Sequence, residues 1–102
     1  MTTEMIEYLN YGSRLRGLIF VKEFDEKTEE LLQSYETLQC CRHQRLVRDR
    51  NTKKEFLVIC ASESDRGRRT NHLILDNRID DELISCVCLP TLVGLNRKVE
   101  LF

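Results

Sequence analysis

Two stretches of similar pattern decide the fold that we expect for this chain: LIFVKEFDEKTEELL (residues 18–32) and LILDNRIDDELI (residues 73–84). Each begins with an apolar run, continues to an apolar residue followed by acidic residues, and ends in apolar residues of a helix. Asp25 and Asp80 stand at the expected helix starts, 55 residues apart. Because self-similarity of this kind indicates repeated structural units, we interpret the stretches as a diverged internal duplication. Two unrelated strand–helix units are the alternative interpretation.

The segments around the two stretches complete the expected fold. Strands are expected over residues 4–10, 14–22, 42–48, 54–61, 70–75 and 98–102, and helices over residues 26–39 and 80–89. This order predicts an α+β domain of two β-β-α-β units, with helices packed on a mostly antiparallel sheet about a pseudo-two-fold axis. The single domain covers residues 1–102, and its halves are residues 1–50 and 51–102. A ferredoxin-like β-α-β-β-α-β core with extra strands is the alternative.

Composition and patterning indicate a small soluble protein. A chain of 102 residues, 41% of them hydrophobic, is long enough for one modest core. Asp25 and Asp80 are expected to cap their helices, because a carboxylate accepts the free N–H groups of a first turn. The residues expected to be buried together are Leu18, Ile19, Phe20, Leu31, Leu32, Leu73, Ile74, Leu75, Leu83 and Ile84. No run approaches the roughly 20 apolar residues that span a bilayer, and the first residues, Met-Thr-Thr-Glu, lack the basic charge of a signal peptide. We therefore expect an intracellular location without membrane contact.

Five cysteines are many for a chain of this length. We expect most of them to be free, buried thiols, although a disulfide is an alternative. The metal-ligating candidates are Cys40, Cys41, His43, Cys86 and Cys88. Their Cys-Cys-x-His and Cys-x-Cys spacings lack the two-to-four-residue spacer of zinc sites, so no metal or other cofactor is predicted. The side chain of His72, beside an apolar strand, is interpreted as structural, and no catalytic residue is assigned. The protein is predicted not to be an enzyme.

A basic stretch offers one candidate function. Residues 42–54 have a net charge of +5, whereas the whole chain has −1. Such a stretch can meet nucleic-acid phosphates, although a solvated basic hairpin is the commoner explanation. The candidate residues for nucleic-acid binding are Arg42, Arg45, Arg48, Arg50, Lys53, Lys54, Arg66, Arg68 and Arg69, with His43 as a further donor. Because the chain is slightly acidic and no helix-turn-helix pattern is present, we treat this function as the alternative.

The leading hypothesis is a small non-enzymatic interaction protein of adaptor type, either monomer or homodimer. Two units of about fifty residues each are expected to meet at a seam with a shallow groove. An exposed strand edge beside such a groove can accept an extended peptide as an additional strand. The residues expected to contact the protein or peptide partner are Tyr8, Lys98, Glu100 and Phe102.

Two resemblances bear on identity. Residues 66–76 resemble the Walker B region of phage terminase ATPases, in which an Arg-Gly-rich stretch leads into an apolar strand ending Asp-Glu. Here Asn77 follows Asp76, and no phosphate-binding Gly-x-x-x-x-Gly-Lys-Ser/Thr loop is present, so ATPase activity is not inferred. Length, duplicated layout and cysteine content together resemble the small orphan proteins of filamentous viruses of hyperthermophilic archaea. That resemblance implies a viral protein in the host cytoplasm without recognised enzymatic activity, so a viral accessory protein is the other form of the leading hypothesis.

Overall fold

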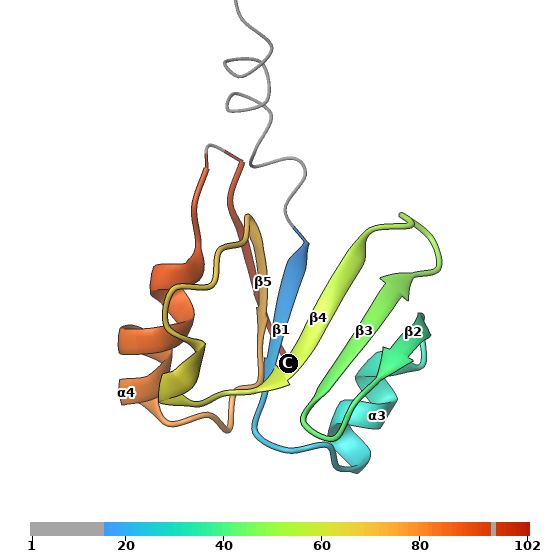
Figure 1. Cartoon of the computed structure of the whole chain (residues 1–102), viewed down its shortest axis with the longest axis horizontal. Coiled ribbons are helices and arrows are strands. Elements are labelled where there is room, and N and C mark those ends of the chain that lie inside the picture. Colours follow the sequence, from blue (N-terminus) through green and yellow to red (C-terminus); the bar gives the residue numbers. More distant parts are fainter. Residues whose placement is uncertain (1–15, 95) are drawn as a thin grey trace, which may run out of the picture.

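The strand β1 (Gly17–Val21) lies near the middle of a six-stranded sheet of order β2-β3-β4-β1-β5-β6 (Figure 1). The computed structural model of the chain describes residues 16–94 and 96–102. All five residues of β1 are buried, because a continuous apolar run is stable where both faces of a sheet are covered. The domain is therefore α+β, as expected, and it is organised around this strand.

The remaining elements follow in chain order. They are α3 (Glu26–Leu32), β2 (Tyr35–Cys40), β3 (Gln44–Asp49), β4 (Glu55–Cys60), β5 (His72–Leu75), α4 (Asp81–Leu83) and β6 (Lys98–Leu101). A 3-10 turn covers Glu63–Asp65, and α4 continues as a π-helical turn, Ile84–Cys88, and a 3-10 turn, Leu89–Thr91. Two of the expected strands fall wholly or partly outside the described residues. They are the strand over residues 4–10, which includes Tyr8, and the start of the strand over residues 14–22.

The sheet is mixed, which corrects the expectation of a mostly antiparallel sheet. β1 is parallel to both β4 and β5, and β5 is parallel to β6. The antiparallel pairs are β2 with β3 and β3 with β4. Parallel neighbours need a crossover between them, and the long segments between these strands provide it. Residues 18–20 lie opposite residues 73–75 in the β1–β5 ladder, so the facing residues are 55 positions apart in sequence.

Two hydrophobic clusters lie on opposite faces of the sheet. On one face, Ile19 and Val21 of β1 pack with Leu32 of α3. On the other, Leu18 and Phe20 pack with Cys88 of the segment that follows α4. The residues expected in one core are thus divided between two clusters. Most are buried, whereas Leu31, Leu83 and Ile84 are only partly buried.

The helix expected over residues 26–39 is wrong in its second half. α3 begins after its predicted cap, Asp25, whose side chain accepts the Thr28 N–H, but it ends at Leu32. Tyr35 then begins β2, and its ring packs edge-on against Phe56 with the ring centroids 5.5 Å apart. The register of β2 against β3 shifts between Thr37 and Gln39. Pairing with β3 therefore outweighs the helical spacing of Tyr35 and Leu38, and Leu38 lies at an irregularity in the strand.

The second helix also differs in detail from the expectation. Its predicted cap is confirmed, because the Asp80 carboxylate accepts the Glu82 N–H at 2.8 Å. The regular helix was expected to end at Leu89, and the π-helical turn ends at Cys88; a 3-10 turn then covers Leu89–Thr91, with Pro90 at its start. Proline is tolerated there because the first turn of a helix does not use its N–H group.

The burial of β5 generates a first prediction. Leu73 is fully buried, whereas Leu38 is 36% exposed. Leu73→Ala should lower the free energy of unfolding by about 2–5 kcal/mol, because it removes buried methyl groups and leaves a cavity. Leu38→Ala should change it by less than about 0.5 kcal/mol. Urea unfolding of both variants measures this, and equal effects would contradict the assigned strand faces.

Candidate functional site

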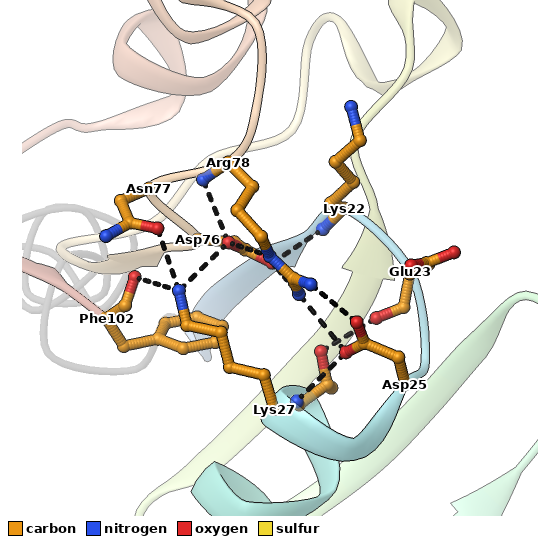
Figure 2. Close-up of polar contacts among 9 residues, drawn as sticks. Lys22, Glu23, Asp25, Lys27, Asp76, Asn77, Arg78 and Phe102 are labelled. Carbon is orange, nitrogen blue, oxygen red and sulfur yellow. Dashed lines mark hydrogen bonds and ion pairs between the residues drawn. The ribbon is translucent and has the colours of Figure 1, made fainter.

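A cluster of charged side chains lies where β1 and β5 end (Figure 2). The two strands are parallel, so their carboxyl ends meet at one edge of the sheet. Asp76 comes directly after β5, and its side chain is fully buried. The backbone N–H of Lys22, directly after β1, donates to Asp76 Oδ2 at 3.0 Å. The sheet itself therefore positions the first carboxylate of the cluster.

Arg78 joins this carboxylate to a second one. Its Nε donates to Asp76 Oδ1 at 3.0 Å and its Nη2 to Asp76 Oδ2 at 2.7 Å. Nη2 also donates to Asp25 Oδ1 at 3.1 Å, and Nη1 donates to Asp25 Oδ2. Asp25 caps α3 on the β1 side of the cluster. The guanidinium of Arg78 thus connects the end of β5 to the start of α3, in the two-pronged geometry that arginine offers to carboxylates.

Lys27 extends the cluster to the end of β6. Its Nζ lies 3.5 Å from Asp76 Oδ1, and it donates to the Phe102 carbonyl oxygen at 3.0 Å and to Asn77 Oδ1 at 2.8 Å. The ammonium also lies 5.2 Å from the centre of the Phe102 ring. The backbone of Phe102 donates to the Leu75 carbonyl and accepts from the Asn77 N–H, both at 2.9 Å. The cluster therefore fixes the carboxyl end of β6 against that of β5.

The electrostatics of the cluster keep both carboxylates ionised. Hydrogen bonds from Arg78 hold the pKa of Asp25 well below its usual range. Burial alone would raise the pKa of Asp76, but hydrogen bonds from Arg78 and from the Lys22 amide outweigh it and hold that pKa well below the usual range as well. Asp76 and Asp25 in turn raise the pKa of Arg78. These groups can therefore orient neighbouring chain segments, but they cannot donate a proton near neutral pH.

The place of the cluster in the fold is one where α/β proteins often bind ligands. The segments after β1 and β5 cover opposite faces of the sheet, and the crevice at such a switch point is a common ligand site. Here the side chains of Asp25, Asp76 and Arg78 meet in that place. No buried side-chain nitrogen or oxygen lacks a partner among residues 16–94 and 96–102. The cluster is therefore a structural connection between three chain segments.

The residues predicted to contact a partner lie next to this cluster. Lys98 and Glu100 are on β6, and Phe102 follows it. All four residues of β6 are exposed. Glu100 Oε2 lies 2.7 Å from His72 Nε2, and Glu100 Oε1 lies 3.5 Å from Lys98 Nζ, so both charges occupy one face of the strand. Val99 and Leu101 are 45% and 67% exposed, and alternation places them on the other face.

The hydrogen bonds of β6 show which backbone groups face away from the sheet. The N–H groups of Lys98 and Phe102 donate inward, to the carbonyls of Asn71 and Leu75, at 2.9 Å. Along a parallel strand the inward-facing residues alternate with outward-facing ones. The N–H and C=O groups of Val99 and Leu101 therefore point outward. Over the described ranges, β6 is the end strand of the sheet.

The candidate nucleic-acid residues do not form one continuous group. Arg42 precedes β3 and Arg50 follows it, so the length of a six-residue strand, about 20 Å, separates them. Several of these side chains already have partners within the chain: Arg45 with Glu29 at 2.9 Å, Lys54 with Asn71 at 3.1 Å, Arg68 with Asp65 at 3.0 Å and Arg66 with the Cys86 carbonyl at 3.3 Å. Arg48 lies opposite Glu36 and Glu55 in the sheet, while Arg50, Lys53 and Arg69 are exposed.

The structure does bring part of the two basic segments together. His43 and Arg68 line one pocket of about 330 Å³. Ile59 of β4, Ser62 and Asp65 also line this pocket. The pocket lies at the carboxyl end of β4. It unites residues that sequence reasoning placed in separate segments.

The cysteines are free but are mostly not buried. Cys40, Cys41 and Cys86 are exposed, Cys60 is half-buried and Cys88 is buried. The expectation of free thiols agrees with this, whereas the expectation that most are buried is wrong. Within the described ranges, no group of three or more His, Cys, Asp or Glu side chains could hold a metal ion. No helix in that part of the chain is long and apolar enough to cross a membrane.

Sequence reasoning did not assign Asp25, Lys27, Asp76 or Arg78 to a common cluster. It assigned Asp25 only as a helix cap, and it did not single out Lys27 or Arg78; Asp76 was considered only in the rejected ATPase resemblance. One signal was present, since polar residues follow directly after two buried apolar runs. Without knowledge that β1 and β5 are parallel neighbours, that signal could not place them together.

No family model, curated protein or solved structure matches this chain.

The cluster generates a prediction about acid stability. The folded pKa of Asp76 lies below the value of about 3.9 for an unfolded aspartate, so its contribution is complete well above that pH and is lost as the pH falls further. In Asp76→Asn, the free energy of unfolding should therefore fall less steeply than in wild type as the pH decreases from about 5 to about 2. Asp81→Asn, which removes an exposed aspartate, should leave that loss unchanged. Urea unfolding at a series of pH values measures both, and a parallel decline in wild type and Asp76→Asn would refute the assignment.

Thiol reactivity generates a further prediction. Cys40, Cys41 and Cys86 should react rapidly with an aromatic disulfide reagent in the folded protein, because they are exposed. Burial raises the pKa of Cys88 to about 11 and also raises that of Cys60, so both should react slowly, since the thiolate is the reactive form. Unfolded, unreduced protein should show five free thiols. Rapid reaction of Cys88 in the folded state would contradict its placement.

Proposed function

We propose that the chain is a small non-enzymatic interaction protein that binds an extended segment of a protein partner along β6. The single observation behind the proposal is that β6 is an edge strand of the sheet among residues 16–94 and 96–102. Its four residues are exposed, and the N–H and C=O groups of Val99 and Leu101 point away from β5. A row of such groups is a template for a further strand, whose main-chain hydrogen bonds provide affinity.

The opposite edge of the sheet is less suited to this role. β2 has an irregular register at Leu38, and irregularities of this kind interrupt a regular row of edge groups. β6 pairs with β5 without a register shift over all four residues. A regular edge offers its hydrogen-bonding groups at the spacing of a second strand, so β6 is the better site for strand addition.

The side chains of β6 define the partner's chemistry. Lys98 and Glu100 lie on one face of the sheet, and Val99 and Leu101 on the other. The partner segment should therefore alternate between charged and apolar residues, with its apolar side chains beside Val99 and Leu101. Directly facing side chains on neighbouring strands interact most strongly when they are apolar pairs or opposite charges.

The charged cluster supports this role because it orders the edge before binding. Lys27 and Asn77 contact the Phe102 backbone directly after β6. A strand held in its bound conformation loses less conformational entropy when a partner adds to it. The cluster therefore contributes to binding through the position of β6, without contacting the partner.

The internal duplication remains part of this proposal, but the partner site is moved from the groove between the repeats to β6. The 55-residue spacing in the β1–β5 ladder and the matching caps at Asp25 and Asp80 support a duplication. However, β1 and β5 meet as a buried ladder, so their seam offers no strand edge to a peptide. We therefore place the partner on β6 instead of in an inter-repeat groove. The adaptor or viral accessory class remains our proposal for its biological role.

Nucleic-acid binding is the second candidate function. The observation that favours it is the pocket shared by His43 and Arg68, which joins residues from both basic segments. The distance between Arg42 and Arg50 along β3 weighs against a continuous phosphate-binding surface. The two candidates differ in site, since strand addition uses β6 and phosphate binding would use the region around residues 42–43 and 66–69.

Strand addition can be tested with a proline variant. Val99→Pro removes an outward N–H without removing an inward ladder bond, so it should block addition while preserving the fold. Seven-residue peptides that alternate valine with lysine, with glutamate or with both serve as probes, and a serine-threonine peptide is the control. At least one valine-containing probe should slow amide exchange at Val99 and Leu101 in wild type, and none should bind Val99→Pro.

Two results would contradict the proposal. One is that no probe protects the outward amides of β6. The other is that binding persists in Val99→Pro while circular dichroism shows an intact fold. Binding of a short DNA duplex that falls steeply with salt, and is equal in both proteins, would favour the nucleic-acid candidate instead.

A further inference from the structure

The short sequence Lys98-Val99-Glu100 has charges of opposite sign on either side of Val99. Both charged side chains lie on one face of β6, where their Nζ and Oε1 atoms are 3.5 Å apart. They are 62% and 45% exposed, so this contact contributes little stability within one chain. When two copies of this strand run antiparallel, Lys98 of each copy can therefore face Glu100 of the other.

The hydrogen bonds of β6 restrict how a second strand can align. Only odd-numbered residues, Val99 and Leu101, direct their N–H and C=O groups outward. In an antiparallel pair, residues whose outward groups bond to each other lie directly opposite. If the second strand is another β6 in antiparallel orientation, each odd-numbered residue must therefore face an odd-numbered residue. The registers that meet this condition differ from one another by shifts of two residues.

The charges then select one of the remaining registers. With Val99 opposite Val99 of a second copy, Lys98 of each copy faces Glu100 of the other. A shift of one copy by two residues in either direction places Lys98 opposite Lys98 or Glu100 opposite Glu100. Like charges directly opposite each other destabilise a strand pair, and opposite charges stabilise it. The register centred on Val99 is therefore the favoured one.

We infer that the partner of β6 is a second copy of the chain, paired antiparallel about a two-fold axis at Val99. This inference rests on the strand addition proposed above and names its occupant. The two Val99 residues exchange both N–H···O bonds at the axis, and two Lys98–Glu100 pairs flank them. The two sheets then continue as one across the axis. This arrangement closes on itself, because the same edge is used by both copies.

The size of the seam predicts a weak, reversible dimer. A strand of four residues buries far less than the roughly 1,200 Å² of a stable interface. The two Val99 side chains, which face each other, and Leu101, which faces the aliphatic stem of Arg97 of the other copy, provide area, whereas the Lys98–Glu100 pairs determine register and partner. Dimer formation should consequently depend on concentration and weaken with added salt.

Charge exchange tests the inference by sedimentation velocity over a range of concentrations. Lys98→Glu should place Glu opposite Glu, and Glu100→Lys should place Lys opposite Lys. Each should raise the dimer dissociation constant about tenfold or more. An equimolar mixture of the two variants should dimerise at least as well as wild type, because residue 98 of each copy then faces a residue 100 of opposite charge in the other. The double variant should recover much of the wild-type affinity.

Matched controls separate the seam from general charge effects. Lys53→Glu and Glu30→Lys change net charge by the same amounts at exposed positions outside β6, and neither should change the dissociation constant. A wild-type protein that remains monomeric up to millimolar concentration would overturn the inference, as would a dimer that is unaffected by both single variants or by Val99→Pro. If the chain is monomeric but the valine-containing probes still protect Val99, only the self-pairing is wrong. If the probes and the self-pairing both fail, the proposed function fails as well.

Discussion

The contact of Arg78 with Asp25 and Asp76 is the interaction on which the arrangement of the chain depends. Asp76 is fully buried at the end of β5, and a buried carboxylate is costly unless charges and N–H groups surround it. Arg78 and Lys27 supply the charges, and the Lys22 amide supplies a further donor. To satisfy Asp76, the ends of β1 and β5 and the start of α3 must therefore meet.

The opposite end of the β1–β5 pair is fixed by a neutral contact. Thr70, fully buried, donates through Oγ1 to the Arg16 carbonyl at 2.8 Å and accepts the His72 N–H at 3.1 Å. Charge at one end and a hydroxyl group at the other thus define the alignment of the two central strands. β6 is aligned with β5 in turn, because the hydrogen bonds between them begin at Asn71 and end at Phe102, which lies in the charged cluster.

The sequence was informative where local chemistry decides the structure. Continuous apolar runs predicted β1, β4 and β5, and the two aspartate caps predicted where α3 and α4 begin. Tyr35 and Leu38 were misread because their spacing from Leu31 fits a helix, whereas the edge-on contact of Tyr35 with Phe56 depends on a strand distant in sequence. The direction of strand pairing and the meeting of Arg78 with Asp25, 53 residues away, are likewise decided by tertiary contacts that no local pattern contains.

The two edge strands of the described sheet, β2 and β6, differ in how regularly they expose their backbone groups. The irregular register at Leu38 interrupts β2, so a second molecule finds no regular row of partners there. β6 is regular, and its charged residues Lys98 and Glu100 lie together on one face of the strand. An unpatterned open edge would allow strands to add in any register and chains to assemble without limit. Because opposite charges flank Val99, the pattern penalises shifted registers, and an antiparallel pair uses each β6 edge once. A regular edge can then remain on the surface without promoting open-ended assembly.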